Sequence, residues 1–187
     1  TGLRVPPANA RYADLLARTG ARDAALTALR TGEGRFGNPA ATAAAARLEA
    51  GGQAAPGALT PARGAAISLY ALGAIFLDEA DFTDGLAALT LALALDPELD
   101  AARISFAEAK INLDQVEAAR AALARLPANS DYALNARMME AFLALRDGAA
   151  DQAVTLARQA VDQGGGARAE RALGDLLRAA SRYDEAR

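Results

Sequence analysis

The apolar residues near the start of the chain are spaced as on one face of an α-helix. Tyr12, Leu15 and Leu16 share such a face in a helix predicted over about residues 9–19. After a glycine that breaks this pattern, a second helix is predicted over about residues 22–29. The chain is therefore expected to begin with a pair of helices joined by a short turn.

Prolines and glycines mark the breaks between predicted helices. Residues 1–8 hold two prolines and are expected to form an extended lead-in. Residues 51–57 hold three glycines and a proline, which makes them the clearest linker in the chain. Thr60-Pro61 then supplies an N-cap and a first helical residue. This division gives an N-terminal part, residues 1–59, and a main helical array, residues 60–187.

Residues 32–37 satisfy the pattern G-x-G-x-x-G, which occurs in dinucleotide-binding sites. Such a site needs a strand directly before the glycines and a helix directly after them. Residues 24–30 are helical by composition, so we interpret residues 32–37 as a loop between helices. Asn38 is then the expected N-cap of an alanine-rich helix that starts at Pro39 and ends near residue 48.

Two small residues recur with one period in the array. The first position reads Gly73, Ala107, Ala141 and Gly174, and the second reads Gly85, Ala119, Ala153 and Ala186. Both sets keep a spacing of about 34 residues, which indicates stacked structural repeats. The predicted units cover about residues 66–99, 100–133, 134–166 and 167–187. Small residues at these places let the two helices of a unit approach closely.

The first of these units fits a 34-residue template, W-x2-L-G-x2-Y, then A-x3-F, then P. Its matching residues are Leu69, Leu72, Gly73, Phe76, Gly85, Leu89 and Pro97. The chain thus resembles the tetratricopeptide repeat family over about two thirds of its length, and residues 12–29 resemble a degenerate repeat. The resemblance implies an all-α fold, a right-handed α-α superhelix (solenoid) of antiparallel helix pairs that binds other polypeptides.

The later units depart from the template. The Trp position holds Arg103, Arg137 and Glu170, and the closing proline is missing after the first unit. The fourth unit stops inside its expected second helix, so we expect a fragment of a longer array. The Ala/Arg-rich composition resembles bacterial members of the family, which occur in the cytoplasm and in the cell envelope. The sequence does not choose between these compartments.

Composition agrees with the helical prediction and narrows the function. Much of the 52% hydrophobic content is alanine and only 5% is aromatic, which favours closely packed helices over a sheet sandwich. A net charge of -3 argues against a nucleic-acid binder. No run of about 18 apolar residues occurs, so no transmembrane helix is predicted in this stretch.

The sequence offers little for catalysis. It has no cysteine and no histidine, which removes Cys/His metal sites, thiol nucleophiles and His-based acid/base groups. Paired carboxylates such as Asp78/Glu79, Asp96/Glu98 and Asp184/Glu185 lie at expected helix ends, where solvation and capping explain them. We therefore predict no catalytic residue, no metal and no cofactor.

In the family, the first helices of successive units line a concave face where peptides commonly bind. The corresponding stripe is mostly apolar over three units and becomes charged and mostly basic in the fourth. Its candidate groove residues are Ile104, Glu108, Ile111, Met138, Phe142, Leu145, Arg168, Arg171 and Arg178. A polypeptide with an apolar segment followed by acidic residues would complement this stripe.

Other interpretations of the same residues stay open. The helix over residues 65–77 is apolar on nearly every face, so its stripe residues are also explained as core. Met138 and Phe142 are explained equally well as core residues and as residues that contact a ligand. The arginines of the fourth unit are also explained as a solvated face. The family's clamp for a chaperone C-terminus is absent, because its positions here hold Tyr70, Ala74, Ser105, Asn135 and Met139. Besides partner binding, self-association and an accessory role in a larger enzyme or an export machine remain alternatives.

Overall fold

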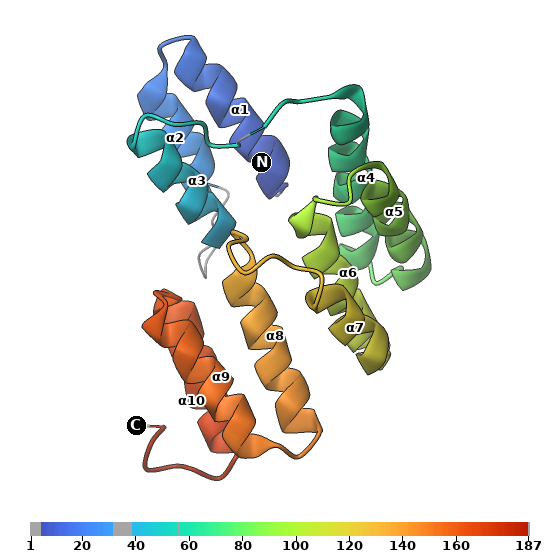
Figure 1. Cartoon of the computed structure of the whole chain (residues 1–187), viewed down its shortest axis with the longest axis vertical. Helices are drawn as coiled ribbons and strands as arrows, with labels where there is room; N and C mark the ends of the chain where they lie inside the picture. Colours follow the sequence, from blue (N-terminus) through green and yellow to red (C-terminus); the bar gives the residue numbers. More distant parts are fainter. Residues whose placement is uncertain (1–4, 32–38, 56, 187) are drawn as a thin grey trace.

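The structure, a computed structural model, describes residues 5–31, 39–55 and 57–186, and these form helices without a strand (Figure 1). The helices are α1 (Pro6–Arg18), α2 (Arg22–Thr31), α3 (Pro39–Glu49), α4 (Pro61–Asp78), α5 (Phe82–Leu95), α6 (Asp100–Asn112), α7 (Val116–Leu123), α8 (Ala133–Arg146), α9 (Ala150–Asp162) and α10 (Gly166–Ala179). The predicted all-α fold is confirmed. No described helix is both long and apolar enough to cross a bilayer.

Helices that follow one another pack in pairs. The pairs are α1/α2, α4/α5, α6/α7 and α8/α9, and α10 packs against α9. Helices α1 to α3 form a group of their own, which we call the N-terminal group, and α8 to α10 lie at the opposite end of the molecule (Figure 1). The pairs from α4 onward follow the predicted period of the array.

The turns inside the pairs repeat one backbone conformation. Ala80, Asp114, Gly148 and Ser181 all have φ between 59° and 78°, the left-handed region, and they recur with the period of the array. After each of them, a backbone N–H donates to the carbonyl five residues earlier, at 2.8 or 2.9 Å. This is the Schellman ending of a helix. Gly20, between α1 and α2, ends its helix in the same way.

Glycine is needed where α4 crosses α5. A Cβ on Gly73 would lie 3.0 Å from Cγ of Leu89, and one on Gly85 would lie 2.7 Å from Cδ2 of Leu77. The equivalent alanines of the next two pairs are fully buried, namely Ala107, Ala119, Ala141 and Ala153. Gly174 differs, because the segment after α10 forms turns and its nearest neighbour would be 3.7 Å away.

The second unit ends early. Helix α7 stops at Leu123, whereas α5 continues to Leu95, the equivalent of residue 129. Pro127 cannot donate a backbone hydrogen bond, so it prevents an equally long helix there. Residues 124–132 instead form turns that lead to α8. These turns bring Asp131 and Tyr132 towards the N-terminal group.

The start of the chain differs from the sequence prediction. An extended lead-in over residues 1–8 is wrong for residues 6–8, because α1 begins at Pro6. Proline fits the first helical positions, where its missing N–H has no partner within the helix. Thr60 caps α4 as predicted, accepting a bond from the Arg63 backbone N–H at 3.1 Å. The glycine pattern at residues 32–37 and Asn38 lie outside the described residues.

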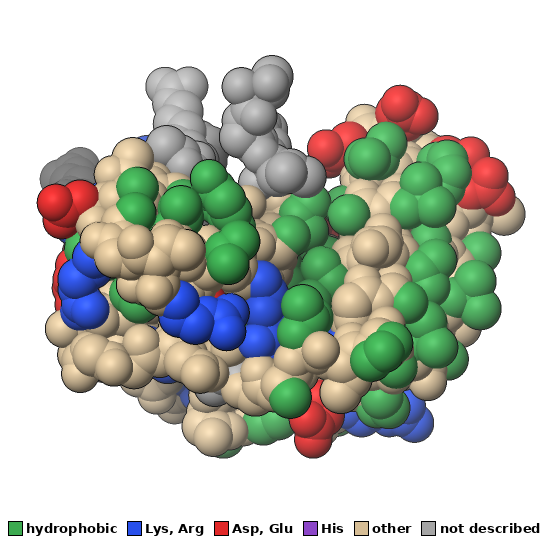
Figure 2. All heavy atoms as spheres, turned by 90° about the horizontal axis from the view of Figure 1, so that it is seen from above, with side chains coloured by type: hydrophobic (Ala, Val, Ile, Leu, Met, Phe, Trp, Pro, Cys, Tyr) green, Lys and Arg blue, Asp and Glu red, His purple; other side chains and the backbone are tan. Residues whose placement is uncertain are grey.

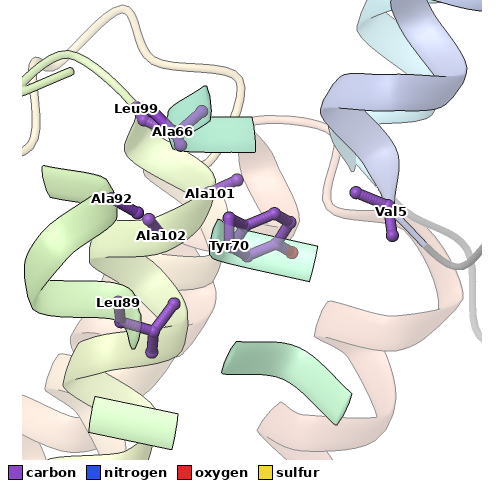
Figure 3. Close-up of a cluster of buried hydrophobic side chains, with 8 residues drawn as sticks. All are labelled: Val5, Ala66, Tyr70, Leu89, Ala92, Leu99, Ala101 and Ala102. Carbon is purple, nitrogen blue, oxygen red and sulfur yellow. The ribbon is translucent and has the colours of Figure 1, made fainter. Parts of the chain in front are cut away.

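Val5 and Asp14 help to fix the N-terminal group to the rest of the molecule. Val5, just before α1, joins a buried cluster formed by α4, α5 and α6, where it lies across from Tyr70 (Figure 3). The buried Asp14 carboxylate of α1 accepts bonds from the backbone N–H groups of Ala54 and Ala55, at 2.6 and 3.0 Å. Asp14 thereby holds the linker that leads to α4.

Candidate functional site

Four of the predicted groove residues pack between consecutive units. Ile104 is buried in a cluster with Ala136 and Leu143 of α8, and Ile111 packs against the same cluster. Met138 and Leu145 are partly buried against a cluster that includes Leu176 of α10. These side chains join one unit to the next in the structure.

The other groove residues with described side chains are exposed. Phe142 is 43% exposed on α8, and Glu108 is exposed at the equivalent position of α6 in the preceding unit. On α10, Arg171 and Arg178 are exposed, and Arg178 pairs with Asp175, the next equivalent of Phe142. The side chain of Arg168 lies outside the described ones. Phe142 is thus the large apolar side chain that the predicted stripe presents to solvent.

A cavity of about 580 Å³ lies where the N-terminal group meets the array. Its lining comes from α1, α3, α4, α6 and the turns before α8. Ile67 of α4 and Ala101 of α6, which are the equivalents of the predicted groove residue Arg168 in the first two units, lie in this lining. The cavity therefore occupies one end of the predicted groove, covered by the N-terminal group.

Arginine is the main charged residue of the cavity. Five line it, namely Arg11, Arg47, Arg63, Arg103 and Arg125, together with the acidic residues Glu98, Asp100 and Asp131. Five positive and three negative side chains leave the lining with a positive balance. A guanidinium presents several N–H donors to a carboxylate, and Arg63 and Arg103 already pair with Asp96 and Asp100.

Most of these arginines already have protein partners. Arg47 forms a two-pronged ion pair with Asp131, with both N–O distances at 2.7 Å. The hydrogen bond to Asp131 is the main reason why the pKa of Arg47 is raised. Arg11 donates to the carbonyls of Ala55 and Gly57 at 3.0 and 2.7 Å. Burial, and then the nearby charge of Arg63, lowers the pKa of Arg11.

No pattern in the sequence marks this cavity. Arg47 and Asp131 are 84 residues apart, and they meet because the shortened α7 leaves room for the turns before α8. The five arginines do not share one repeat position, so periodicity could not group them. Among the described residues, no cluster of acidic side chains could hold a metal ion.

Comparison with known proteins identifies the repeats. Residues 76–137, from the end of α4 to the start of α8, match the family model described as tetratricopeptide repeat. This segment of the chain is thus similar to tetratricopeptide repeats. A crystal structure of MamA has a similar fold, with a TM-score of 0.55 and 20% identity over 93% of this chain and 87% of that chain. A second crystal structure of MamA protein gives 0.54 and 20%, over 97% and 86%.

At this level of identity the likeness to MamA shows the fold alone. No curated protein matches the sequence. The resemblance to tetratricopeptide repeats seen in the sequence is confirmed, and the repeats together with the fold support a protein-interaction scaffold in general terms. The helix pairs outside the matched segment extend the same architecture on both sides.

Proposed function

We propose that the chain is a scaffold without catalysis of its own, which binds a polypeptide along the first helices of its tetratricopeptide repeats. The observation that carries this proposal is the exposure of the Phe142 side chain. Phe142 is a large aromatic side chain, 43% exposed, at a position where Glu108 and Asp175 are also exposed on the neighbouring first helices. Aromatic side chains with one open face are typical anchors of protein interfaces.

Charge suggests the chemistry of the partner. The cavity at one end of this line of helices has a positive balance, and Arg171 is exposed at the other end. A polypeptide with an apolar residue for Phe142 and acidic residues towards its two ends, beyond the carboxylates Glu108 and Asp175, would complement the surface. Charged residues at the margin of such an interface mostly raise the association rate and the salt sensitivity.

The proposal is tested by affinity capture with the immobilised chain, comparing the parent with Phe142→Glu. The proposal predicts that a bound polypeptide is lost with Phe142→Glu. Tyr12→Glu is the matched control, since Tyr12 is a similarly exposed aromatic residue on α1, away from this line of helices. Equal capture by the parent and both variants would contradict the assignment of the surface.

A further inference from the structure

One face of α4 is more exposed than its counterpart in every later repeat, where the equivalents of Leu72, namely Phe106, Glu140 and Leu173, are partly buried. On this face, Leu72 is 43% exposed and Ile75 is 54% exposed. The face also includes Ser68, one turn earlier, which is exposed too. We call Ser68, Leu72 and Ile75 the leading face of the array. Figure 2 shows a band of hydrophobic side chains along the α4/α5 side of the molecule.

In the later repeats, the residues equivalent to Ser68 and Ile75 are buried. The equivalents of Ile75 are Ala109, Leu143 and Leu176, and all three are buried. The equivalents of Ser68, namely Ala102, Ala136 and Ala169, are also buried. Leu143 packs with Ile104 and Ala107 of the preceding unit. In three successive units, therefore, this face packs against the helix pair that comes before it.

Ion pairs cross the same junctions. Arg120 of α7 pairs with Asp147, just after α8, and Arg158 of α9 pairs with Glu185. In these two pairs the arginine belongs to the preceding unit and the acid to the following one, whereas in Arg146–Asp114 and Arg182–Asp151, which cross the same junctions, the acid belongs to the preceding unit. By the repeat period, Asp147 corresponds to Glu79, and Glu185 corresponds to Asp84.

Glu79 therefore stands where the junction before α8 receives a cation, and Asp84 stands where the junction before α10 does. Both are exposed, and neither forms an ion pair within the described part of the chain. The N-terminal group leaves these acids and the leading face uncovered. It packs elsewhere, through Val5 and the Arg47–Asp131 pair.

We propose that the leading face binds a helical hairpin of a partner protein, which stacks on α4 and α5 as a preceding repeat would. The hairpin presents an apolar stripe to Leu72 and Ile75 and carries Arg or Lys side chains opposite Glu79 and Asp84. This surface is separate from the Phe142 surface of the proposed function, so each can fail without the other.

The far end of a second copy of this chain does not match the face. At the covered junctions, the preceding first helix contributes Ile104 and Ile111, or Met138 and Leu145. The equivalent positions of α10 hold Arg171 and Arg178. Stacking α10 on α4 would press these guanidinium groups against Leu72 and Ile75, with a large desolvation cost.

A peptide taken from this chain provides the probe. Residues 133–163, the α8/α9 hairpin, cover Leu176 of α10 in the structure, and Arg158 reaches Glu185. A fluorescently labelled peptide of this sequence is titrated with the full chain, and its anisotropy is measured. The parent is expected to bind it, and Leu72→Gln/Ile75→Gln is expected to weaken binding by at least about tenfold.

Two controls make the assignment specific. Leu59→Gln changes a similarly exposed leucine in the linker and is expected to leave binding unchanged. Arg158→Glu in the peptide is expected to weaken binding, and Asp84→Arg in the chain is expected to restore it. The substituted residues of the chain are exposed, so its circular dichroism should be unchanged.

The inference is overturned if the parent does not bind the peptide, or if the Leu72/Ile75 variant binds it equally well. If the peptide instead took the place of α8 and α9 within the chain, the parent and the Leu72/Ile75 variant would bind it equally well. Sedimentation of the parent alone is expected to show a monomer. Self-association that is lost with Ile75→Gln would identify a second copy as the occupant and overturn the assignment to a partner protein.

Discussion

Gly73 and Gly85 face each other where α4 crosses α5, and a Cβ on Gly73 would lie 3.1 Å from the carbonyl oxygen of Gly85. The backbones of the two helices are thus in contact, with no room for a side chain. The first complete unit depends on this approach, because both glycines are buried where its two helices cross.

Replacing Gly73 by leucine is expected to lower the free energy of unfolding by about 1–3 kcal/mol, because the new side chain overpacks the crossing. Chemical denaturation measures the loss. Gly64→Ala in the same helix is the control, since a Cβ there meets nothing within 4 Å. Gly64→Ala should stabilise the chain by up to about 1 kcal/mol through helix propensity. Equal stability of Gly73→Leu and the parent would contradict the close crossing.

The Arg47–Asp131 pair ties α3 to the turns before α8. Its side chains are 34% and 30% exposed, so solvent screens the interaction in part. A double-mutant cycle with Arg47→Gln and Asp131→Asn is expected to give a coupling of about 0.5–1 kcal/mol. The more exposed Arg30–Glu49 pair, at 3.5 Å, serves as the comparison and should couple more weakly. A coupling no larger than that of Arg30–Glu49 would show that the contact does not hold the N-terminal group.

Two tyrosines, the buried Tyr70 and the partly buried Tyr132, make stability sensitive to alkaline pH. Burial raises the pKa of Tyr70, and it raises the pKa of Tyr132 well above the usual 10.0. Above about pH 10 the unfolded chain loses these protons before the folded chain does, so the free energy of unfolding falls as pH rises. The stability contributed by these phenols is therefore complete below pH 10 and is lost above it.

Urea denaturation at several values between pH 9 and pH 11 tests this dependence. Tyr132→Phe is expected to flatten the decline, because the variant has no phenol to ionise at that site. Tyr183→Phe, at an exposed position, is the matched control. An identical decline in the parent and in Tyr132→Phe would show that the burial of Tyr132 does not govern alkaline stability.

The regular part of the fold could be predicted from particular residues. The alanines and glycines that recur once in each unit indicated where paired helices cross, and the structure buries Ala107, Ala119, Ala141 and Ala153 there. The turn positions follow the same period, since a chain that reverses in the same way needs a left-handed residue at the same place. The repeat period and the small residues were sufficient to predict these helix crossings, because the two helices that cross follow one another in the sequence.

The cavity could not be predicted, because it depends on contacts outside the repeat period. Arg47 and Asp131 come from an irregular helix and an irregular turn, and no spacing in the sequence links them. Ile104 and Met138 show a second limit. An apolar stripe on a first helix looks the same in sequence whether it faces a ligand or the next unit, and in the structure both residues pack towards the next unit.

Site-specific photo-crosslinking shows directly whether a polypeptide binds next to Phe142. A photoreactive amino acid is placed at residue 142 and, separately, at residue 12, and cross-linked products are separated by mass. Binding along the first helices predicts that a polypeptide is cross-linked from residue 142. An excess of unlabelled parent chain should prevent this cross-link, whereas an excess of Phe142→Glu should not. Cross-linking from residue 12 alone would contradict binding along the first helices. The same is true if Phe142→Glu prevents the cross-link from residue 142 as well as the parent chain does.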